Sequence, residues 1–283
     1  MSTATATATV PGAPAVPGAA ASGARARILA VTSGKGGVGK TFMSANLAAA
    51  LARRGERVLV LDADLGLANL DVVLNLFPKT TLHDVFTGKS TLDAALLPAP
   101  GGFDVLLAGS GLVEYSRLTP EVRDQLLDVI EKVSPRYDRI VLDTGAGISD
   151  VVLYTVSLAH DVLVVATPEP TSLTDAYATI KVLAAQQERR LIRLVVNQVS
   201  RVGEGKVIRS QLQQVIDRYV APTLVREGDG TAEMVKLMLL GEVPVDPAVR
   251  EAVVKRQLLM QLLPGCPSAR AVQGVAEKLT AEA

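Results

Sequence analysis

The clearest chemical signal in the sequence is the loop 33–41, which reads Ser-Gly-Lys-Gly-Gly-Val-Gly-Lys-Thr. Gly34, Gly39, Lys40 and Thr41 fill the fixed positions of the phosphate-loop pattern G-x-x-x-x-G-K-[ST]. Glycines let successive backbone N–H groups surround phosphate oxygens, and the helix that follows directs its positive end at the same anion. The pattern predicts that Lys40 contacts the β- and γ-phosphates and that the Thr41 hydroxyl ligates Mg²⁺. The alternative is a glycine-rich turn before a helix, which the matching flanks disfavour.

Two acidic clusters follow apolar runs further along the chain. The first run ends in Asp62, and Asp64 comes two residues later, so an extended backbone directs both carboxylates to one side. The second run ends in Asp143, which is followed by Thr-Gly-Ala-Gly. Beside a phosphate loop, one carboxylate of the first pair can hold metal-bound water and the other can orient an attacking water. Asp143 is then expected to support Mg²⁺. The alternative for the Asp62 and Asp64 pair is a solvated loop after a strand.

Apolar runs and helical periodicity predict the elements that position these residues. Short runs rich in β-branched residues predict strands at 28–32, 57–61, 104–107, 139–142, 162–166 and 192–196. A helix is expected over 42–54, and helical spacing marks two further stripes, Val122, Leu126, Val129, Ile130 and Val133, and Ile208, Leu212, Val215, Ile216 and Tyr219. The alternation predicts an α/β fold, a doubly wound, mainly parallel sheet flanked by helices. Ligands then bind at the carboxyl ends of the strands.

Composition limits the classes of function that remain. The 283-residue chain has 29 basic and 29 acidic residues, so net charge gives no argument for nucleic-acid binding. The single cysteine, Cys266, excludes a disulfide framework or a multi-cysteine metal site within one chain, and a reducing, cytoplasmic setting is expected. No apolar stretch approaches the ~20 residues that span a bilayer. Residues 1–24 are rich in Ala, Thr and Pro and are predicted to form a disordered tail before one folded domain over 25–283.

A second lysine, Lys35, makes the phosphate loop unusual. The loop resembles the deviant Walker A loop of the MinD/ParA class of P-loop ATPases, in which this signature lysine reaches the nucleotide of a partner subunit. The segments 62–71 and 143–147 resemble switches I and II of the MinD group, and 167–181 is also similar to that group. The residues at 143–147 and 168–171 most resemble those of the FlhG/FleN (YlxH) subfamily, which controls flagellar number and placement. The alternative for Lys35 is a solvated loop lysine.

The resemblance implies ATP and Mg²⁺ as cofactors and assigns roles to individual residues. Lys35, Lys40 and Asp64 become catalytic, with Asp64 positioning the hydrolytic water, and Thr41, Asp62 and Asp143 surround the metal. Asn197 is expected to contact adenine, and the segment 241–246 to line the base. The nucleotide-binding residues are then Gly34, Lys35, Gly36, Gly37, Val38, Gly39, Lys40, Thr41, Phe42, Asn197, Pro244 and Asp246.

Two features of the family are weak in this chain. The 1–24 stretch has no Asp-Gln-Ala motif of the kind with which some FlhG proteins stimulate the partner GTPase FlhF. Near the end of the sequence, Ala269, Val272, Val275, Ala276 and Leu279 form a helical stripe, but only Arg270 and Lys278 are basic and Trp and Phe are absent there. We expect this helix to pack on the domain instead of binding membrane. The segment 253–263 is a second candidate for a membrane contact.

These observations predict an ATPase that dimerises with itself on ATP and resets to a monomer on hydrolysis. It would regulate flagellar number and placement, or another positioned assembly, in the cytoplasm or at the inner face of the membrane or cell pole. A flagellar GTPase or a transcription regulator is the expected partner. The alternative is a ParA-type partitioning ATPase that binds nonspecific DNA, which the balanced charge disfavours. An iron–sulfur scaffold ATPase is a third reading, which the lone Cys266 opposes.

Overall fold

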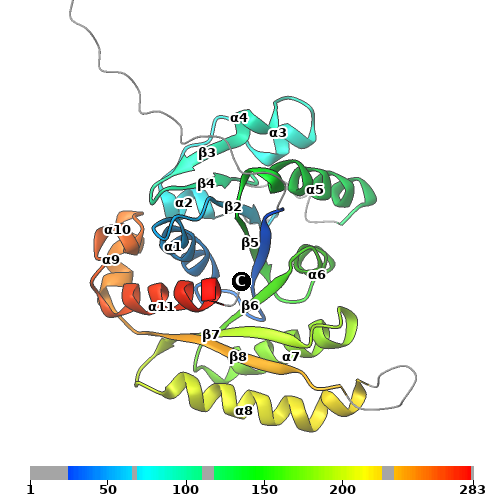
Figure 1. Cartoon of the computed structure of the whole chain (residues 1–283), viewed down its shortest axis with the longest axis vertical. Coiled ribbons are helices and arrows are strands. Elements are labelled where there is room, and N and C mark those ends of the chain that lie inside the picture. The colour runs from blue at the N-terminus through cyan, green and yellow to red at the C-terminus, as the bar shows by residue number, and fades with distance from the viewer. Residues whose placement is uncertain (1–24, 66–68, 110–117, 225–232, 282–283) are drawn as a thin grey trace, which may run out of the picture.

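The part of the chain that the structure describes folds around one eight-stranded sheet with helices on both faces (Figure 1). The computed structural model describes residues 25–65, 69–109, 118–224 and 233–281, so the predicted tail 1–24 lies outside the described residues. The strand order is β3-β4-β2-β5-β1-β6-β7-β8. The strands are β1 (Arg27–Ser33), β2 (Val58–Ala63), β3 (Leu96–Ala99), β4 (Phe103–Leu106), β5 (Arg139–Ala146), β6 (Asp161–Ala166), β7 (Leu191–Val199) and β8 (Lys236–Pro244).

All neighbouring strands pair in parallel except β3, which pairs antiparallel with β4 at one edge. The mainly parallel, doubly wound sheet predicted from the sequence is therefore confirmed, and all six predicted strands are present. Two strands were not predicted, β3 and β8, and each forms an edge of the sheet. Proline and glycine interrupt both, because β3 contains Pro98 and β8 contains Gly241 and ends at Pro244. Such residues are tolerated at edges, where one side of the strand needs no partner.

The helices form two layers, one on each face of the sheet. On one face lie α1 (Lys40–Ala52), α2 (Leu70–Leu74), α9 (Pro247–Lys255), α10 (Leu259–Leu262) and α11 (Pro267–Ala281). Against the other face lie α3 (Leu82–Phe86), α4 (Leu92–Ala95), α5 (Pro120–Val133), α6 (Asp150–Ser157), α7 (Pro170–Gln186) and α8 (Glu204–Tyr219). Short 3₁₀ turns occur at Ser134–Arg136 and Ala221–Thr223.

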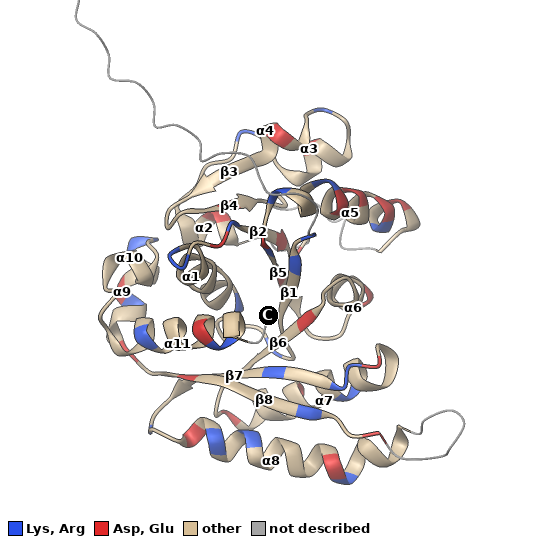
Figure 2. Cartoon of the chain, viewed as in Figure 1, with Lys and Arg blue, Asp and Glu red and all other residues tan. Residues whose placement is uncertain are grey.

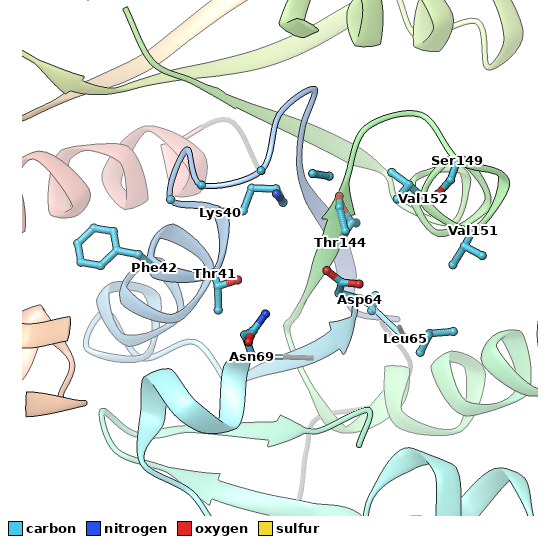
Figure 3. Close-up of a pocket in the computed structure, with 16 residues that line it drawn as sticks. Lys40, Thr41, Phe42, Asp64, Leu65, Asn69, Thr144, Ser149, Val151 and Val152 are labelled. Carbon is cyan, nitrogen blue, oxygen red and sulfur yellow. The ribbon is translucent and has the colours of Figure 1, made fainter. Parts of the chain in front are cut away.

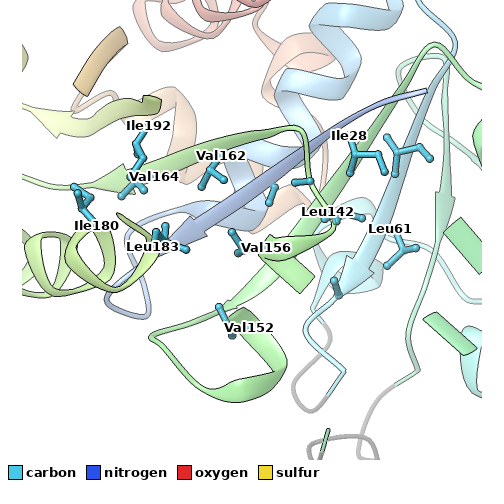
Figure 4. Close-up of a cluster of buried hydrophobic side chains, with 14 of the residues drawn as sticks. Ile28, Leu61, Leu142, Val152, Val156, Val162, Val164, Ile180, Leu183 and Ile192 are labelled. Atoms are coloured by element: carbon cyan, nitrogen blue, oxygen red, sulfur yellow. The ribbon is translucent and has the colours of Figure 1, made fainter. Parts of the chain in front are cut away.

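Strand residues alternate between the two apolar cores, which is why the strands read as continuous apolar runs. In β1, Ile28 and Ala30 belong to the core under α5, α6 and α7, while Leu29 and Val31 belong to the core under α1. Figure 4 shows the first of these cores, in which aliphatic side chains of β1, β2, β5, β6 and β7 meet those of α6 and α7. Burying these side chains stabilises the sheet by ~25 cal/mol per Å² of apolar surface.

The predicted helical stripes are confirmed, with one correction. The stripe of α5 is buried along its whole length, and Ile208, Leu212 and Ile216 of α8 are buried as well. Val215 and Tyr219 are exposed, 38% and 54%, although their helical spacing placed them in the stripe. They lie beside the 208–212–216 line, and α8 covers an edge of the sheet, so a stripe one residue wide is enough to bury its contact.

The stripe of α11 is buried, with each of its five apolar residues at most 3% exposed. This helix packs on α1 and β8, as expected from its few basic residues. In the second candidate membrane segment, residues 258–260 are buried in the core, while Val253 and Val254 are exposed. Among the described residues, none of the helices has both the length and the apolar character that crossing a bilayer requires.

Candidate nucleotide-binding site

The phosphate loop joins β1, at the centre of the sheet, to α1. Gly39 is the N-cap of α1 in a left-handed conformation, φ 97°, which favours glycine, and it has no side chain to cap the helix. The first N–H groups of α1 are therefore left for an anion. A cavity of about 670 Å³ opens beside the loop, between α1, β2, β5 and α6 (Figure 3). Its described lining residues are Gly36, Gly37, Gly39, Lys40, Thr41, Phe42, Ala63, Asp64, Leu65, Asn69, Thr144, Gly145, Ala146, Ser149, Val151 and Val152.

The first glycine of the loop has a packing role. A Cβ atom at Gly34 would lie 2.2 Å from the backbone of Asp175 in α7. Real Cβ atoms do not approach backbone so closely, so any larger residue would push the loop away from α7. The loop pattern therefore reflects close packing at Gly34 and backbone conformation at Gly39.

Asp62 and Asp143 lie side by side at the carboxyl ends of β2 and β5, where they are register partners. They are 1% and 2% exposed. The Asp62 carboxylate accepts hydrogen bonds from the backbone N–H of Asp64, 3.3 Å, and of Leu70, 3.4 Å. Asp143 accepts one from the Ser44 hydroxyl, 2.8 Å, on α1. The structure thus brings the two acids together, and the bond to Leu70 links Asp62 to the start of α2.

Burial dominates the electrostatics of these groups. It raises the pKa of Asp143 to about 6, although hydrogen bonds from Thr41 and Ser44 and the charge of Lys40 oppose the rise. Burial, together with the charge of Asp143, raises the pKa of Asp62 well above its ordinary value. Burial also lowers the pKa of Lys40, against the pull of Asp143 and Asp64. The Lys40 ammonium donates to the Ser33 hydroxyl, 3.0 Å.

Asp64 is placed differently from Asp62. It is half-buried and lines the cavity together with Thr41 and Thr144 (Figure 3). We expected both acids of the pair to face one site. Only Asp64 borders the open cavity, because Asp62 turns into the protein to receive the two backbone bonds. The pair therefore divides into one buried acid and one acid within reach of solvent.

Lys35 is held by its own chain. Its ammonium lies 2.8 Å from the Glu169 carboxylate and 2.9 Å from the Thr171 hydroxyl, both at the start of α7. The side chains of Lys35 and Glu169 are 39% and 63% exposed. The ammonium is therefore paired within its own chain, while the side chain remains partly exposed to solvent.

A second cavity, of about 370 Å³, lies next to the first and shares Gly39 and Phe42 with it. It contains the three residues expected to contact the base, because Asn197, Pro244 and Asp246 all line it. Its apolar wall comes from the α9 region and consists of Val245, Val249, Val253 and Val254. We expected the segment 241–246 to form one loop that lines the base. Instead, Gly241–Pro244 belong to β8.

Several site residues were not predicted from the sequence. One of them contacts an acid, because the Ser44 hydroxyl donates to Asp143. The phosphate cavity is also lined by Asn69, Thr144 and Ser149. The Lys35 ammonium is bound by Glu169 and Thr171. Ser44 lies one helical turn after Thr41, so its spacing could have indicated a residue on the same face of α1. Asn69 and Glu169 fall within segments that we compared with the MinD group, but their contacts depend on tertiary structure.

The donor set suits Mg²⁺ bound together with a nucleotide. Within the described ranges, no three His, Cys, Asp or Glu side chains gather into a group that could hold a metal ion alone. Mg²⁺ at phosphoryl-transfer sites takes most of its oxygen ligands from phosphates and water, with one or two from the protein. The Thr41 hydroxyl and the Asp143 carboxylate would meet that need. The buried acids beside Lys40 would supply negative charge opposite the cation.

Comparisons with known proteins agree with this geometry. The CobQ/CobB/MinD/ParA nucleotide-binding domain matches residues 29–259. The antiactivator FleN of Pseudomonas aeruginosa is 41% identical over 253 residues, which cover 89% of this chain and 86% of FleN. The flagellum site-determining protein YlxH of Helicobacter pylori is 31% identical over 258 residues, or 90% and 82% of the two chains.

Solved structures lead to the same family. The cell division ATPase MinD of Pyrococcus furiosus superposes with a TM-score of 0.72 at 27% identity, covering 91% of this chain and 99% of that one. MinD of Pyrococcus horikoshii, solved with Mg-ADP, has a TM-score of 0.70 at 26% identity, covering 90% and 96%. The chain therefore belongs to the MinD/ParA family of P-loop proteins, and it is an ATPase that uses ATP with Mg²⁺.

Proposed function

We propose that this ATPase is a switch that dimerises with ATP, regulates flagellar number or placement, and returns to a monomer on hydrolysis. The observation that carries the dimer is the position of Lys35. Its ammonium is bonded to Glu169 and Thr171, and the described residues that line the phosphate cavity do not include it. A partly exposed loop cation that is held at the start of α7 suits a partner's nucleotide better than its own. The flagellar role is supported by the identity to FleN and YlxH.

Within this proposal, each acid has a distinct task. Asp143 and the Thr41 hydroxyl would hold Mg²⁺, which would neutralise charge on the phosphate oxygens. Asp62 would hold water bound to that cation, and it anchors α2 through the Leu70 N–H. Asp64, at the open cavity, orients the attacking water. Lys40 contacts the β- and γ-phosphates.

Lys35 then supplies the charge that an arginine finger supplies in other P-loop enzymes, where it contributes about 10³–10⁵ in rate. A lysine lacks the bidentate fork of arginine, so a smaller acceleration and slow basal hydrolysis follow. Slow hydrolysis suits a switch, because the ATP-bound dimer must persist long enough to engage a partner.

For partners we propose the protein itself and a flagellar GTPase or transcription regulator, since the FleN relative is described as an antiactivator. We place the protein in the cytoplasm, with a peripheral contact at the inner face of the membrane or the cell pole. The second candidate function is ParA-type partitioning on DNA. Balanced charge, with both signs mixed along α5 and α8 (Figure 2), favours the switch over DNA binding.

The test is the molar mass of the protein with ATP, measured by light scattering for wild type, Lys35→Ala and Asp64→Ala. We expect an ATP-dependent dimer for wild type, a trapped dimer for Asp64→Ala, and loss of the dimer for Lys35→Ala. A fully active monomeric Lys35→Ala enzyme would contradict the proposed trans role. Co-sedimentation of the Asp64→Ala protein with DNA but not with liposomes would favour partitioning.

A further inference from the structure

Asn197, which we expected to contact adenine, is bonded to the phosphate loop in this structure. It lies on β7, 5% exposed. Its side-chain N–H donates to the Val38 carbonyl, 2.8 Å, and its side-chain oxygen accepts from the Gln198 N–H, 3.0 Å. These two bonds fix the orientation of the amide, because reversing it would set oxygen against oxygen and N–H against N–H. The side chain therefore joins β7 to the loop across 159 residues of sequence.

The bond to Val38 also fixes a neighbouring donor. The Val38 carbonyl and the Gly39 N–H belong to one trans peptide group, so they point in opposite directions. Holding the carbonyl on Asn197 turns the Gly39 N–H away from Asn197. Gly39 lines both the phosphate cavity and the base cavity, whereas Asn197 lines the base cavity. The close approach needs glycine, since a Cβ atom at Gly39 would lie 2.5 Å from the Asn197 amide nitrogen.

We propose that Asn197 is a positioning residue that holds the phosphate loop in its anion-binding form, with the Gly39 N–H directed at phosphate, whether or not a base is bound. The inference rests on the loop being the phosphate site. Without the bond, the buried Val38 carbonyl loses its partner and the peptide is free to rotate. A lost hydrogen bond of this kind corresponds to a factor of about 5–10 in the population of the bound-like form.

The test separates the loop from the base by using a ligand that has no base. Binding of Mg-ATP and of Mg-tripolyphosphate is measured by calorimetry for wild type and Asn197→Leu, which has a similar shape but loses the donor without adding a charge near the phosphates. We expect both ligands to weaken by the same factor, about 5–10. Weaker ATP with unchanged tripolyphosphate would assign Asn197 to the base alone and overturn the proposal, as would no change in either ligand.

A matched control comes from the apolar wall of the base cavity. Val249→Ala is expected to weaken ATP but leave tripolyphosphate within twofold, which shows that the two ligands report on different regions. If Asn197→Leu does not fold, Asn197→Ser replaces it. Hydrogen exchange of the nucleotide-free loop 34–42 gives an independent readout, and we expect it to quicken about 5–10-fold in the variant. Unchanged exchange would overturn the proposal, while a wild type that binds neither ligand would instead count against the phosphate site itself.

Discussion

Buried charge is arranged in opposite ways at the two ends of the strands of the central sheet, which we call the amino edge and the carboxyl edge. At the amino edge, Asp161 at the start of β6 is buried, with its side chain 7% exposed. It accepts hydrogen bonds from Arg193, 2.6 Å, which is itself 5% exposed, and from Arg27. Burial alone would raise the pKa of Asp161, but the two guanidinium groups outweigh it and the pKa is lowered. The charge is paired within the chain.

At the carboxyl edge the acids are also buried, but there burial affects their pKa values more than their hydrogen-bond and charge partners do. Asp62 and Asp143 lie beside each other, and the pKa of each is raised. The pKa of Lys40 nearby is lowered, again chiefly by burial. Groups held away from their preferred charge states reduce the stability of the free protein and gain most when a counter-ion binds. The amino edge therefore stabilises the fold, and the carboxyl edge is prepared for a phosphate and a cation.

The largest effect is expected at the carboxyl edge. Asp143→Asn should lower Mg²⁺-dependent ATP hydrolysis by about 10²–10³-fold, because a preorganised charge is lost from the site. In the nucleotide-free protein the same change should raise the unfolding midpoint. A raised folded pKa means that charging Asp143 costs stability, so the gain is full above pH about 6 and fades as pH falls toward 3.8.

Hydrolysis assays and thermal unfolding between pH 4 and 8 measure both halves of this prediction. The control is Glu251→Gln, a carboxylate in an exposed ion pair with Lys255, 2.7 Å. That change should leave both quantities nearly unaltered, within ~0.5 kcal/mol for stability. An Asp143→Asn protein that is less stable than wild type at pH 8 would contradict the contrast between the edges.

At the amino edge the same type of substitution should act in the opposite sense. Asp161→Asn leaves Arg193 buried without its charge partner and should destabilise the fold by about 3 kcal/mol at pH 7. A lowered folded pKa contributes stability that is present above 3.8 and is lost as pH falls through the folded value, so the difference should close in acid. Denaturant unfolding at pH 3 and 7 measures it. A loss of the same size at both pH values would mean that packing, not charge, holds this edge.

The sequence predicted those parts of the site in which local pattern and chemistry coincide. The phosphate loop follows a buried strand, Asp62 and Asp143 lie toward the carboxyl ends of two others, and a parallel sheet brings these ends together. The pattern could not predict the direction in which each acidic side chain points. Asp62 and Asp64 share a side by alternation, yet Asp62 turns inward because the Leu70 N–H, eight residues on, offers it a hydrogen bond.

Long-range contacts account for most of what the sequence did not reveal. Asn197 was expected to bind adenine, and its bond to Val38 spans 159 residues. The partners of Lys35 are 134 and 136 residues away. The missed edge strand β8 has a different cause, because Gly241 and Pro244 interrupt its apolar pattern. Residue pattern predicts which face is buried, whereas pairing across the sheet decides which polar atoms meet.

The smallest effect is expected at Lys35, which lies at the carboxyl edge but is paired with Glu169. Its ion pair with Glu169 is exposed, so it contributes only ~0.2–1 kcal/mol, a factor of about 1.4–5. If the ATP dimer draws both lysines away from α7, the pair must break twice. Glu169→Gln should then tighten the dimer by the square of that factor, about 2–25-fold, without raising the affinity of the monomer for ADP.

Sedimentation equilibrium with ATP at 50 and 300 mM salt measures the dimer constant. Because exposed pairs are screened by ions, the advantage of Glu169→Gln over wild type should shrink at the higher salt. Thr171→Val is the matched control, since it removes the neutral partner of the same ammonium, 2.9 Å away, without removing a charge. Its effect should be nearly independent of salt. A weaker dimer for Glu169→Gln would mean that Glu169 serves the interface itself, and Lys35 would then be positioned by that contact instead of being restrained by it.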